Sequence, residues 1–181
     1  DSERVAGGSS GGSAVSVATG MCLGSVGTDT RGSIRIPSAF CGVVGLKPTR
    51  GRVPLDGVLP LSWTLDHAGP IAGTVGDVAL LFEVLSRRRR RKAPPAGKAA
   101  RLRIGICDYY WRDLDREVER PLKSALRRFE SWGFEVHPIG IQNIDEALEA
   151  SRVLAAADAL AVHREYIRTK ADCYVFNDNY F

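Results

Sequence analysis

Two glycine-dense loops near the start of the chain carry the side chains that could do chemistry. Residues 7–13 read GGSSGGS, and residues 27–37 read GTDTRGSIRIP. Glycine tolerates backbone angles that other residues avoid, so such loops can bring several N–H groups close to one bound atom. A serine hydroxyl is a weak nucleophile until a base takes its proton, and acyl transfer also needs N–H donors around the developing oxyanion. The two loops could supply both the nucleophile and the donors.

Two simpler interpretations compete with a catalytic site. A Gly/Ser run can be a flexible linker, and a glycine-rich loop can cradle phosphate. Neither phosphate-binding pattern, GxxxxGK[ST] or GxGxxG, is present. The segment after the first loop, Ser13–Leu23 (SAVSVATGMCL), is apolar and small enough to form a buried helix, which argues against a linker. Composition alone supports a catalytic and a structural role about equally.

Three longer segments resemble the amidase signature family: GGSSGGSAVSVATG, GTDTRGSIRIPSAFCGVVGLKPTRGRV and LDHAGPIAGTVGDVALLFEVL. The resemblance covers residues 7–85 and extends more loosely through LRIGICDYYWRDLDREVERPLKSALRRFESWGFEV to HREYIRTKADCY. It implies an α/β fold, an α/β/α sandwich with a mixed β-sheet core that is incomplete at both ends here. It also implies hydrolysis of a carboxylic amide to an acid plus ammonia or an amine through an acyl-serine intermediate, with no metal or organic cofactor.

Carried over by position, the resemblance assigns roles to individual residues. Ser33 of GSIRIP corresponds to the nucleophile, and Ser9 corresponds to a bridging serine on an unusual cis peptide. A neutral lysine accepts a proton from Ser9, which accepts one from Ser33. Ser10 supports this relay by hydrogen bonding. Asp29 and Arg35 correspond to an ion pair that braces the nucleophile loop.

The family's oxyanion hole corresponds to the backbone N–H groups of Thr30, Arg31, Gly32 and Ser33. Arg31 stands where the signature often has glycine. Arginine keeps its backbone N–H, so the donor survives. A position that needs positive φ would be strained there, which puts the oxyanion geometry in question.

The catalytic lysine of the family lies upstream of the first glycine loop, whereas this sequence begins at Asp1. Full members are also more than twice as long. We therefore expect a fragment that lacks the catalytic lysine and is inactive by itself. Lys47 is the alternative base, but the family carries a lysine at that position as well, which favours a structural role.

The residues of the chain are also compatible with other chemistries and roles. His67 could act as a general base on Ser33, as in Ser-His-Asp hydrolases, although a histidine in a turn is commonly a plain hydrogen-bonding residue. A cysteine hydrolase could use Cys41 with His67, His137 or His163, but the AFCGVVG context is typical of a buried thiol. The chain could instead be the glutamine-hydrolysing component of a tRNA-dependent amidotransferase, or a non-catalytic binding remnant.

At 181 residues the chain is long enough for one domain with a sizeable core. We divide it into residues 1–86 with the serine loops, a basic linker or surface insertion at 87–100, and a continuation of the same domain at 101–181. Six of the 25 basic residues lie in Arg87–Lys92, and the other 19 are outnumbered by 21 acidic residues. The run therefore reads as a solvated linker and argues against a nucleic-acid partner.

The four scattered cysteines suit neither a disulfide framework nor a zinc site, so we expect a cytoplasmic protein without a metal. No stretch is apolar and long enough to predict a membrane partner. The expected partner is a small-molecule amide, and homo-oligomerisation is left open.

Periodicity and turn signals predict the elements that must position the loops. Residues 101–139 read as a β–α–β unit, which suggests a partly parallel sheet covered by helices. The predicted helices are Ser13–Leu23, Ile36–Gly42, a Thr74-capped helix to Ser86, Asp115–Trp132 and a last helix from Asn143 towards Arg168 with a buried Ala-rich middle, followed by a loop from Thr169; the predicted strands are Ser25–Thr28, Gly42–Thr49, Leu102–Cys107 and one beginning at Phe134–Val136.

Overall fold

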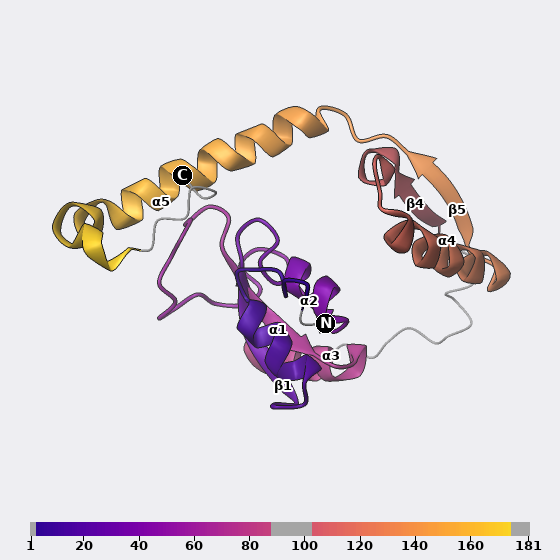
Figure 1. The fold of residues 1–181 in the computed structure, drawn as a ribbon, viewed down its shortest axis with the longest axis horizontal. Coiled ribbons are helices and arrows are strands. Elements are labelled where there is room, and N and C mark those ends of the chain that lie inside the picture. Colours follow the sequence, from indigo (N-terminus) through magenta and orange to yellow (C-terminus); the bar gives the residue numbers. More distant parts are fainter. Residues whose placement is uncertain (1–2, 88–102, 175–181) are drawn as a thin grey trace. The chain divides into compact units, whose positions relative to one another are not determined.

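The computed structural model describes residues 3–87 and 103–174, which fall into two compact units (Figure 1). The serine-loop unit contains residues 1–90 and 148–181, and the β–α–β unit contains residues 91–147. Apart from Arg87, the predicted linker at 87–100 lies outside the described residues, so the role of the Arg87–Lys92 run stays a prediction.

A three-stranded antiparallel sheet forms the centre of the serine-loop unit. Its strands are β1 (Gly24–Asp29), β2 (Val44–Gly45) and β3 (His67–Ala72), in the order β1-β3-β2. The register between β1 and β3 runs from Gly24 opposite Ala72 to Asp29 opposite His67. The end of β1, where the chain enters the second glycine loop, therefore lies beside the start of β3.

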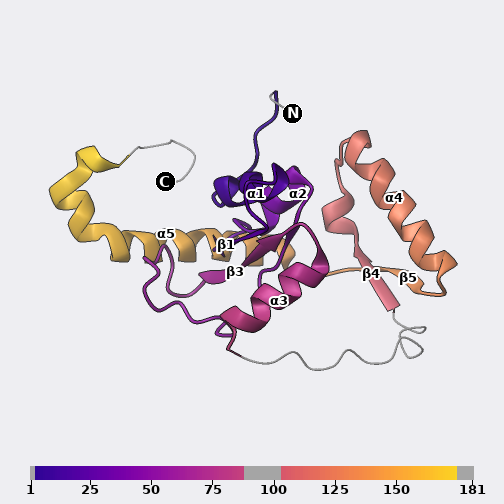
Figure 2. The same ribbon diagram turned by 90° about the horizontal axis from the view of Figure 1, so that it is seen from below.

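Helices cover both faces of this sheet. Figure 2 shows α1 (Gly11–Ala18) and α2 (Arg35–Cys41) on one side of the sheet and α3 (Val75–Leu85) on the other. Two glycines of β1 allow this close approach. A Cβ on Gly24 would lie 2.6 Å from Leu81 Cδ1 of α3, and a Cβ on Gly27 would lie 2.8 Å from Ser10 Oγ. The sheet can thus be covered tightly on both faces only because these positions have no side chain.

The core on the α1 side is small and apolar. Ala14 and Val17 of α1 are buried against Ile34 and Ile71, and Cys22, Cys41 and Val43 pack around them. Ile34 directly follows Ser33 in the chain, so the packing of Ile34 in this core also holds the loop that carries Ser33.

The helix signals in this unit were largely reliable. Thr74 caps α3 by accepting the N–H of Asp77 at 3.1 Å, as its sequence pattern predicts. Helix α2 ends at Cys41 and is followed by Gly42 as its C-cap, which is in the left-handed conformation with φ 68°. Helix α1, by contrast, ends at Ala18, earlier than predicted, because the chain turns at Gly20 with φ 74°.

Strand predictions were less accurate. The predicted strand Gly42–Thr49 is reduced to the two residues of β2. The segment around His67, interpreted as a turn, instead forms β3, whose residues Ala68–Ala72 are all buried. Burial on both faces removes the alternating pattern that marks a half-exposed strand, and Pro70 argues against a central strand.

The β–α–β unit has the predicted topology. Strands β4 (Arg103–Cys107) and β5 (Glu135–Ile139) pair in parallel and are joined by a 3-10 helix, η2 (Asp108–Trp111), and by α4 (Arg116–Ser131). The side chain of Asp115 caps α4 by accepting the N–H of Glu117 at 2.8 Å. The chain leaves α4 through Gly133, whose φ is 85°.

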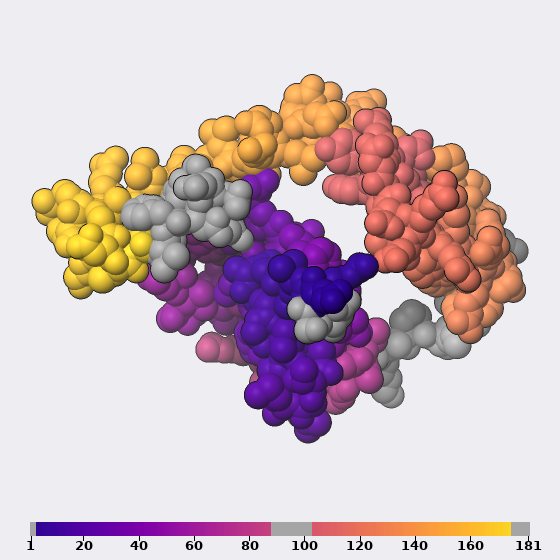
Figure 3. All heavy atoms as spheres, in the orientation of Figure 1, coloured from indigo at the N-terminus to yellow at the C-terminus, as the bar shows by residue number. Residues whose placement is uncertain are grey.

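The last helix, α5 (Ile144–Lys170), is followed by a 3-10 helix, η3 (Ala171–Cys173), where a loop was predicted. Its Ala-rich middle was expected to be buried, and this was wrong. Ala159 is buried, but 61% of Val153 and 54% of Leu160 are exposed, and α5 lies open on the face seen in Figure 3. Among the described residues, no helix combines the length and apolar character needed to cross a membrane.

Candidate active site

The loop of residues 29–35, called the nucleophile loop here after the role that the family resemblance assigns to Ser33, joins β1 to α2 and is organised by one buried carboxylate. Asp29 is fully buried at the end of β1. Its Oδ1 accepts the N–H of Gly32 at 2.7 Å, and its Oδ2 accepts the N–H of Ile34 at 3.2 Å. Arg35 adds Nη2 to Oδ1 and Nε to Oδ2, both at 3.0 Å. The ion pair expected between Asp29 and Arg35 is therefore present and closes the loop around Ser33.

The environment of Asp29 favours its ionised form. Burial by itself disfavours the charge, but hydrogen bonds from the Arg35 guanidinium and from the N–H groups of Gly32 and Ile34 outweigh it. Together they hold the pKa of Asp29 below its ordinary value of 3.8. Asp29 is thus a stable anion at neutral pH around which the loop can fold.

Gly32 cannot be replaced by another residue without strain. Its φ is 124°, and an added Cβ would lie 2.7 Å from Ile36 Cδ1. Its N–H is directed at Asp29, so the expectation that it donates to an oxyanion needs revision. Thr30, Arg31 and Ser33 remain as candidate donors. The positive-φ residues other than glycine in the described part of the chain are Arg87, Asp113 and Asn143, so the strain considered for Arg31 does not arise.

The first glycine loop is attached to the nucleophile loop through Ser10. The Ser10 N–H donates to the carbonyl of Ser33 at 3.1 Å. The Ser10 hydroxyl donates to the carbonyl of Thr28 at 3.1 Å and accepts the N–H of Thr28 at 3.2 Å. The peptide bond between Gly8 and Ser9 is cis, as the resemblance implied. Ser10 thus holds the loop that carries Ser9 against the loop that carries Ser33.

Lys47 and His67 are engaged with each other. Lys47 Nζ lies 3.3 Å from His67 Nε2 and donates to the carbonyl of Pro48 at 3.2 Å. His67 Nδ1 lies 2.6 Å from the carbonyl of Leu65. A carbonyl only accepts, so Nδ1 carries the hydrogen and Nε2 faces the lysine with its lone pair. Both nitrogens of His67 are therefore occupied, which disfavours its use as a base on Ser33.

The cysteine alternative gains no support from the contacts of Cys41. Its thiol is partly buried and lies 3.6 Å from the carbonyl of Ala6. His137 contacts Glu135, and His163 contacts Tyr174. Residues 3–87 and 103–174 contain no group of three His, Cys, Asp or Glu side chains arranged to hold a metal ion.

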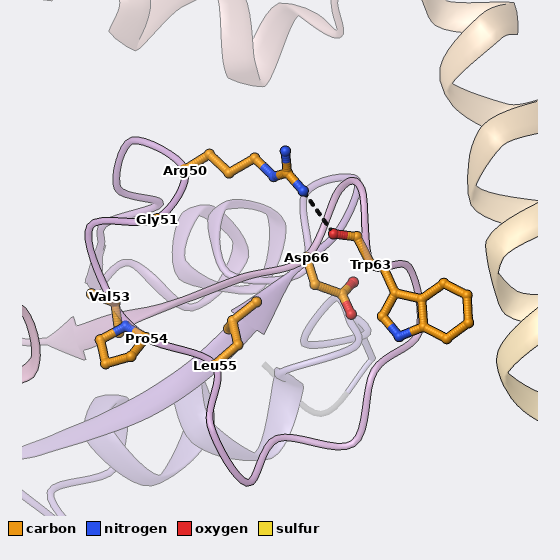
Figure 4. A pocket seen from close by; sticks show the side chains of 7 residues that line it. All are labelled: Arg50, Gly51, Val53, Pro54, Leu55, Trp63 and Asp66. Atoms are coloured by element: carbon orange, nitrogen blue, oxygen red, sulfur yellow. Dashed lines mark hydrogen bonds between the residues drawn. The ribbon is translucent and has the colours of Figure 1, made fainter.

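A largely apolar pocket of about 550 Å³ adjoins this region (Figure 4). Arg50 Nη2 crosses its rim to the carbonyl of Trp63 at 2.9 Å. Asp66 lines the same pocket, and its Oδ1 accepts the Thr30 hydroxyl at 2.5 Å. The wall of the pocket is therefore tied to the nucleophile loop. The lining residues are Arg50, Gly51, Val53, Pro54, Leu55, Trp63 and Asp66.

Sequence reasoning did not single out these lining residues. The segment from Arg50 to Pro60 reads only as rich in turns. The signal that could have found the pocket is the presence of the apolar residues Val53 and Leu55 in this turn-rich segment, with Trp63 shortly after it.

The family model described as Amidase matches residues 1–181. This chain belongs to the amidase signature family. Among curated relatives, it is 47% identical to the indoleacetamide hydrolase of Pseudomonas savastanoi over 141 residues, covering 78% of this chain and 30% of the relative. It is 40% identical to a glutamyl-tRNA(Gln) amidotransferase component from Thermodesulfovibrio yellowstonii over 172 residues, covering 88% of this chain and 36% of the relative.

Solved structures of amidase signature enzymes show the same α/β fold. One, described as an amidase, has a TM-score of 0.88 and 37% identity, covering 97% of this chain and 39% of that structure. The corresponding glutamyl-tRNA(Gln) amidotransferase component from Thermotoga maritima has a TM-score of 0.80 and 33% identity, covering 95% and 42%. The chain thus spans about a third of the length of the curated relatives it matches.

Proposed function

We propose that the protein carrying this sequence hydrolyses a carboxylic amide, with Ser33 as nucleophile and Ser9 as the proton relay. The observation that carries the proposal is the construction of the nucleophile loop. Asp29 gathers three backbone N–H groups and the Arg35 guanidinium around Ser33, while Ser10 attaches the loop that carries Ser9. Membership of the amidase signature family gives this loop its chemical interpretation.

In the proposed reaction, the Ser33 oxygen attacks the amide carbon while its proton passes to Ser9, and Ser9 passes its own proton to a base. The N–H groups of Thr30, Arg31 and Ser33 stabilise the negative oxygen of the tetrahedral intermediate. The leaving nitrogen then takes the relayed proton and the C–N bond breaks, which leaves Ser33 acylated. Water attacks the acyl-serine, returns Ser33 to its free form and releases the acid.

The base in this proposal is a lysine upstream of the first loop, outside this sequence. Lys47 is less suited, because its ammonium group is already engaged with His67 and Pro48. A lysine can accept a proton only when it is held uncharged. The proposal involves no cofactor, since the serines, the lysine and the backbone N–H groups supply every group that the reaction needs.

A fluorophosphonate probe with mass-spectrometric mapping tests the proposal. The probe reacts with activated serines, so we expect one adduct, on Ser33, in the parent protein, meaning the complete reading frame in which this sequence occurs. If the base is the proposed upstream lysine, the 181-residue chain alone should remain unlabelled. Labelling of the short chain at Ser33 would shift the role of base to Lys47. A folded parent protein with no adduct, or with one elsewhere, would contradict the proposal.

The apolar pocket favours an amide with an apolar acyl group over glutamine, the substrate of the amidotransferase alternative. Pro54, Leu55 and Trp63 can accommodate a hydrocarbon ring, whereas glutamine would bring a charged amino-acid head group to this wall. We expect the parent protein to hydrolyse phenylacetamide with a kcat/KM at least about tenfold above that for glutamine. The opposite preference would favour the glutamine-hydrolysing component of an amidotransferase.

We also propose a cytoplasmic location, which rests on the cysteines. Cys22, Cys41, Cys107 and Cys173 are all free thiols. Free thiols suit a reducing compartment.

A further inference from the structure

A second carboxylate, Asp66, also holds the nucleophile loop, through the side chain of Thr30. Only 6% of Asp66 is exposed. Its Oδ1 accepts the Thr30 hydroxyl at 2.5 Å, while its Oδ2 accepts the N–H groups of Leu61 at 2.8 Å and Ser62 at 3.0 Å. Both oxygens of this buried group are therefore committed, and one of them is committed to the loop that carries Ser33.

The turn that presents Asp66 is fixed in its own right. The Ser62 hydroxyl donates to Asp158 Oδ2 at 2.6 Å, and the N–H of Thr64 donates to the same oxygen at 3.1 Å. The N–H of Leu65 donates to Ser62 Oγ at 3.1 Å. Hydrogen bonds from Ser62 and Thr64 lower the pKa of Asp158. Asp66 is thus held by a turn that is anchored to α5, and it offers Thr30 a fixed acceptor.

Thr30 occupies a position where a small rotation matters. It follows Asp29 directly and precedes Arg31, and its N–H is the first candidate oxyanion donor of the loop. A β-branched side chain has few rotamers, so fixing the hydroxyl also restrains the backbone of the residue that carries it. Asp29 fixes the interior of the loop through Gly32, Ile34 and Arg35. The orientation of the Thr30 N–H, the first candidate oxyanion donor, depends instead on the hydrogen bond between Thr30 and Asp66.

We infer that Asp66 is a positioning residue for amide hydrolysis, because its hydrogen bond from the Thr30 hydroxyl aims the oxyanion N–H donors. This inference rests on the proposed function of Ser33. Neither side chain needs to touch the substrate. The hydrogen bond restricts where the N–H groups of Thr30 and Arg31 can point when negative charge develops on the carbonyl oxygen.

Paired substitutions at Thr30 in the parent protein test the inference. Thr30→Val keeps the shape but removes the hydroxyl, and Thr30→Ser keeps the hydroxyl but removes the methyl group. Activity is expressed per active site titrated with a fluorophosphonate, so a loss of folded protein does not count. We expect Thr30→Val to lower kcat about tenfold to a hundredfold with KM within about twofold, whereas Thr30→Ser stays within about threefold of the wild type.

Asp66→Asn provides the second arm. We expect Asp66→Asn to lower kcat about as much as Thr30→Val does. In the double variant, adding Thr30→Val should lower kcat by less than about a further twofold, because the two residues act as one unit. A titrated kcat of Thr30→Val equal to that of the wild type would overturn the inference, as would fully additive losses. These results are distinct from failure of the proposed function, which would appear as an active Ser33→Ala variant.

Discussion

Replacing Ser33 by alanine in the parent protein is expected to lower kcat for amide hydrolysis by at least about four orders of magnitude. In the proposed mechanism, the hydroxyl oxygen of Ser33 is the only protein atom that becomes covalently bonded to the substrate. The main chain of Ser33 keeps its contact with Ser10, since that bond uses the carbonyl of Ser33. KM should therefore change little. Steady-state kinetics with phenylacetamide measure both quantities.

Ser38→Ala is the matched control for this substitution. Ser38 lies in α2, a few residues after Ser33, and is 3% exposed. Its hydroxyl has no hydrogen-bond partner in the described part of the chain. Removing a buried hydroxyl without a partner should leave kcat unchanged and stability unchanged or slightly raised. A fall in kcat as large as that of Ser33→Ala would mean that any serine lost near α2 disturbs the site.

Ser9→Ala extends this prediction to the relay. If Ser9 and Ser33 work as one unit, the double variant should lose about as much activity as Ser33→Ala alone. If Ser33→Ala retained the wild-type rate, Ser33 would not be the nucleophile, whereas a wild-type parent protein without any amide hydrolysis would be a binding remnant of its family. If the losses in kcat of the two single variants multiplied in the double variant, Ser9 would not act in the same proton relay as Ser33.

The contacts that sequence could predict are those that the family resemblance carried over. The ion pair of Asp29 with Arg35, which lie six residues apart, was implied by that resemblance, and it is present. The cis peptide before Ser9 and the supporting position of Ser10 followed from the family resemblance. The β–α–β unit was predictable because α4 and its strands have distinct periods and clear caps.

Contacts that depend on tertiary placement could not be predicted. The hydrogen bond from the Thr30 hydroxyl to Asp66 joins residues 36 apart in sequence and depends on β3 lying beside β1. The segment that forms β3 was itself predicted to be a turn. The direction of the Gly32 N–H follows from a φ of 124°, which glycine permits but does not require. The burial expected for the middle of α5 failed because alanine and leucine content indicates only what could be buried.

Asp29→Asn is expected to lower the free energy of unfolding of the parent protein by about 3 kcal/mol at neutral pH. Asparagine has nearly the same shape, but its amide can no longer accept on both sides. The side-chain NH2 group of the asparagine would face N–H groups of Gly32, Ile34 or Arg35, which are themselves donors and cannot accept a hydrogen bond. The loss falls at the lower end of the range for a broken buried pair, because 54% of the Arg35 side chain is exposed and can regain water. Chemical denaturation measures the difference, and Asp56→Asn, at an exposed aspartate, is the control.

The same variant should reveal the charge of Asp29 through its pH dependence. The folded protein holds the pKa of Asp29 below 3.8, so the stability that the anion contributes is complete above that pH. It is lost as the pH falls from 3.8 through the lowered pKa, because the folded state then has to take up a proton that the unfolded state already holds. Asparagine does not titrate, so the gap between wild type and Asp29→Asn should narrow on acidification from neutral pH to about pH 3. A gap that stays constant over this range would mean that Asp29 braces the nucleophile loop by shape and hydrogen bonding alone, without its charge.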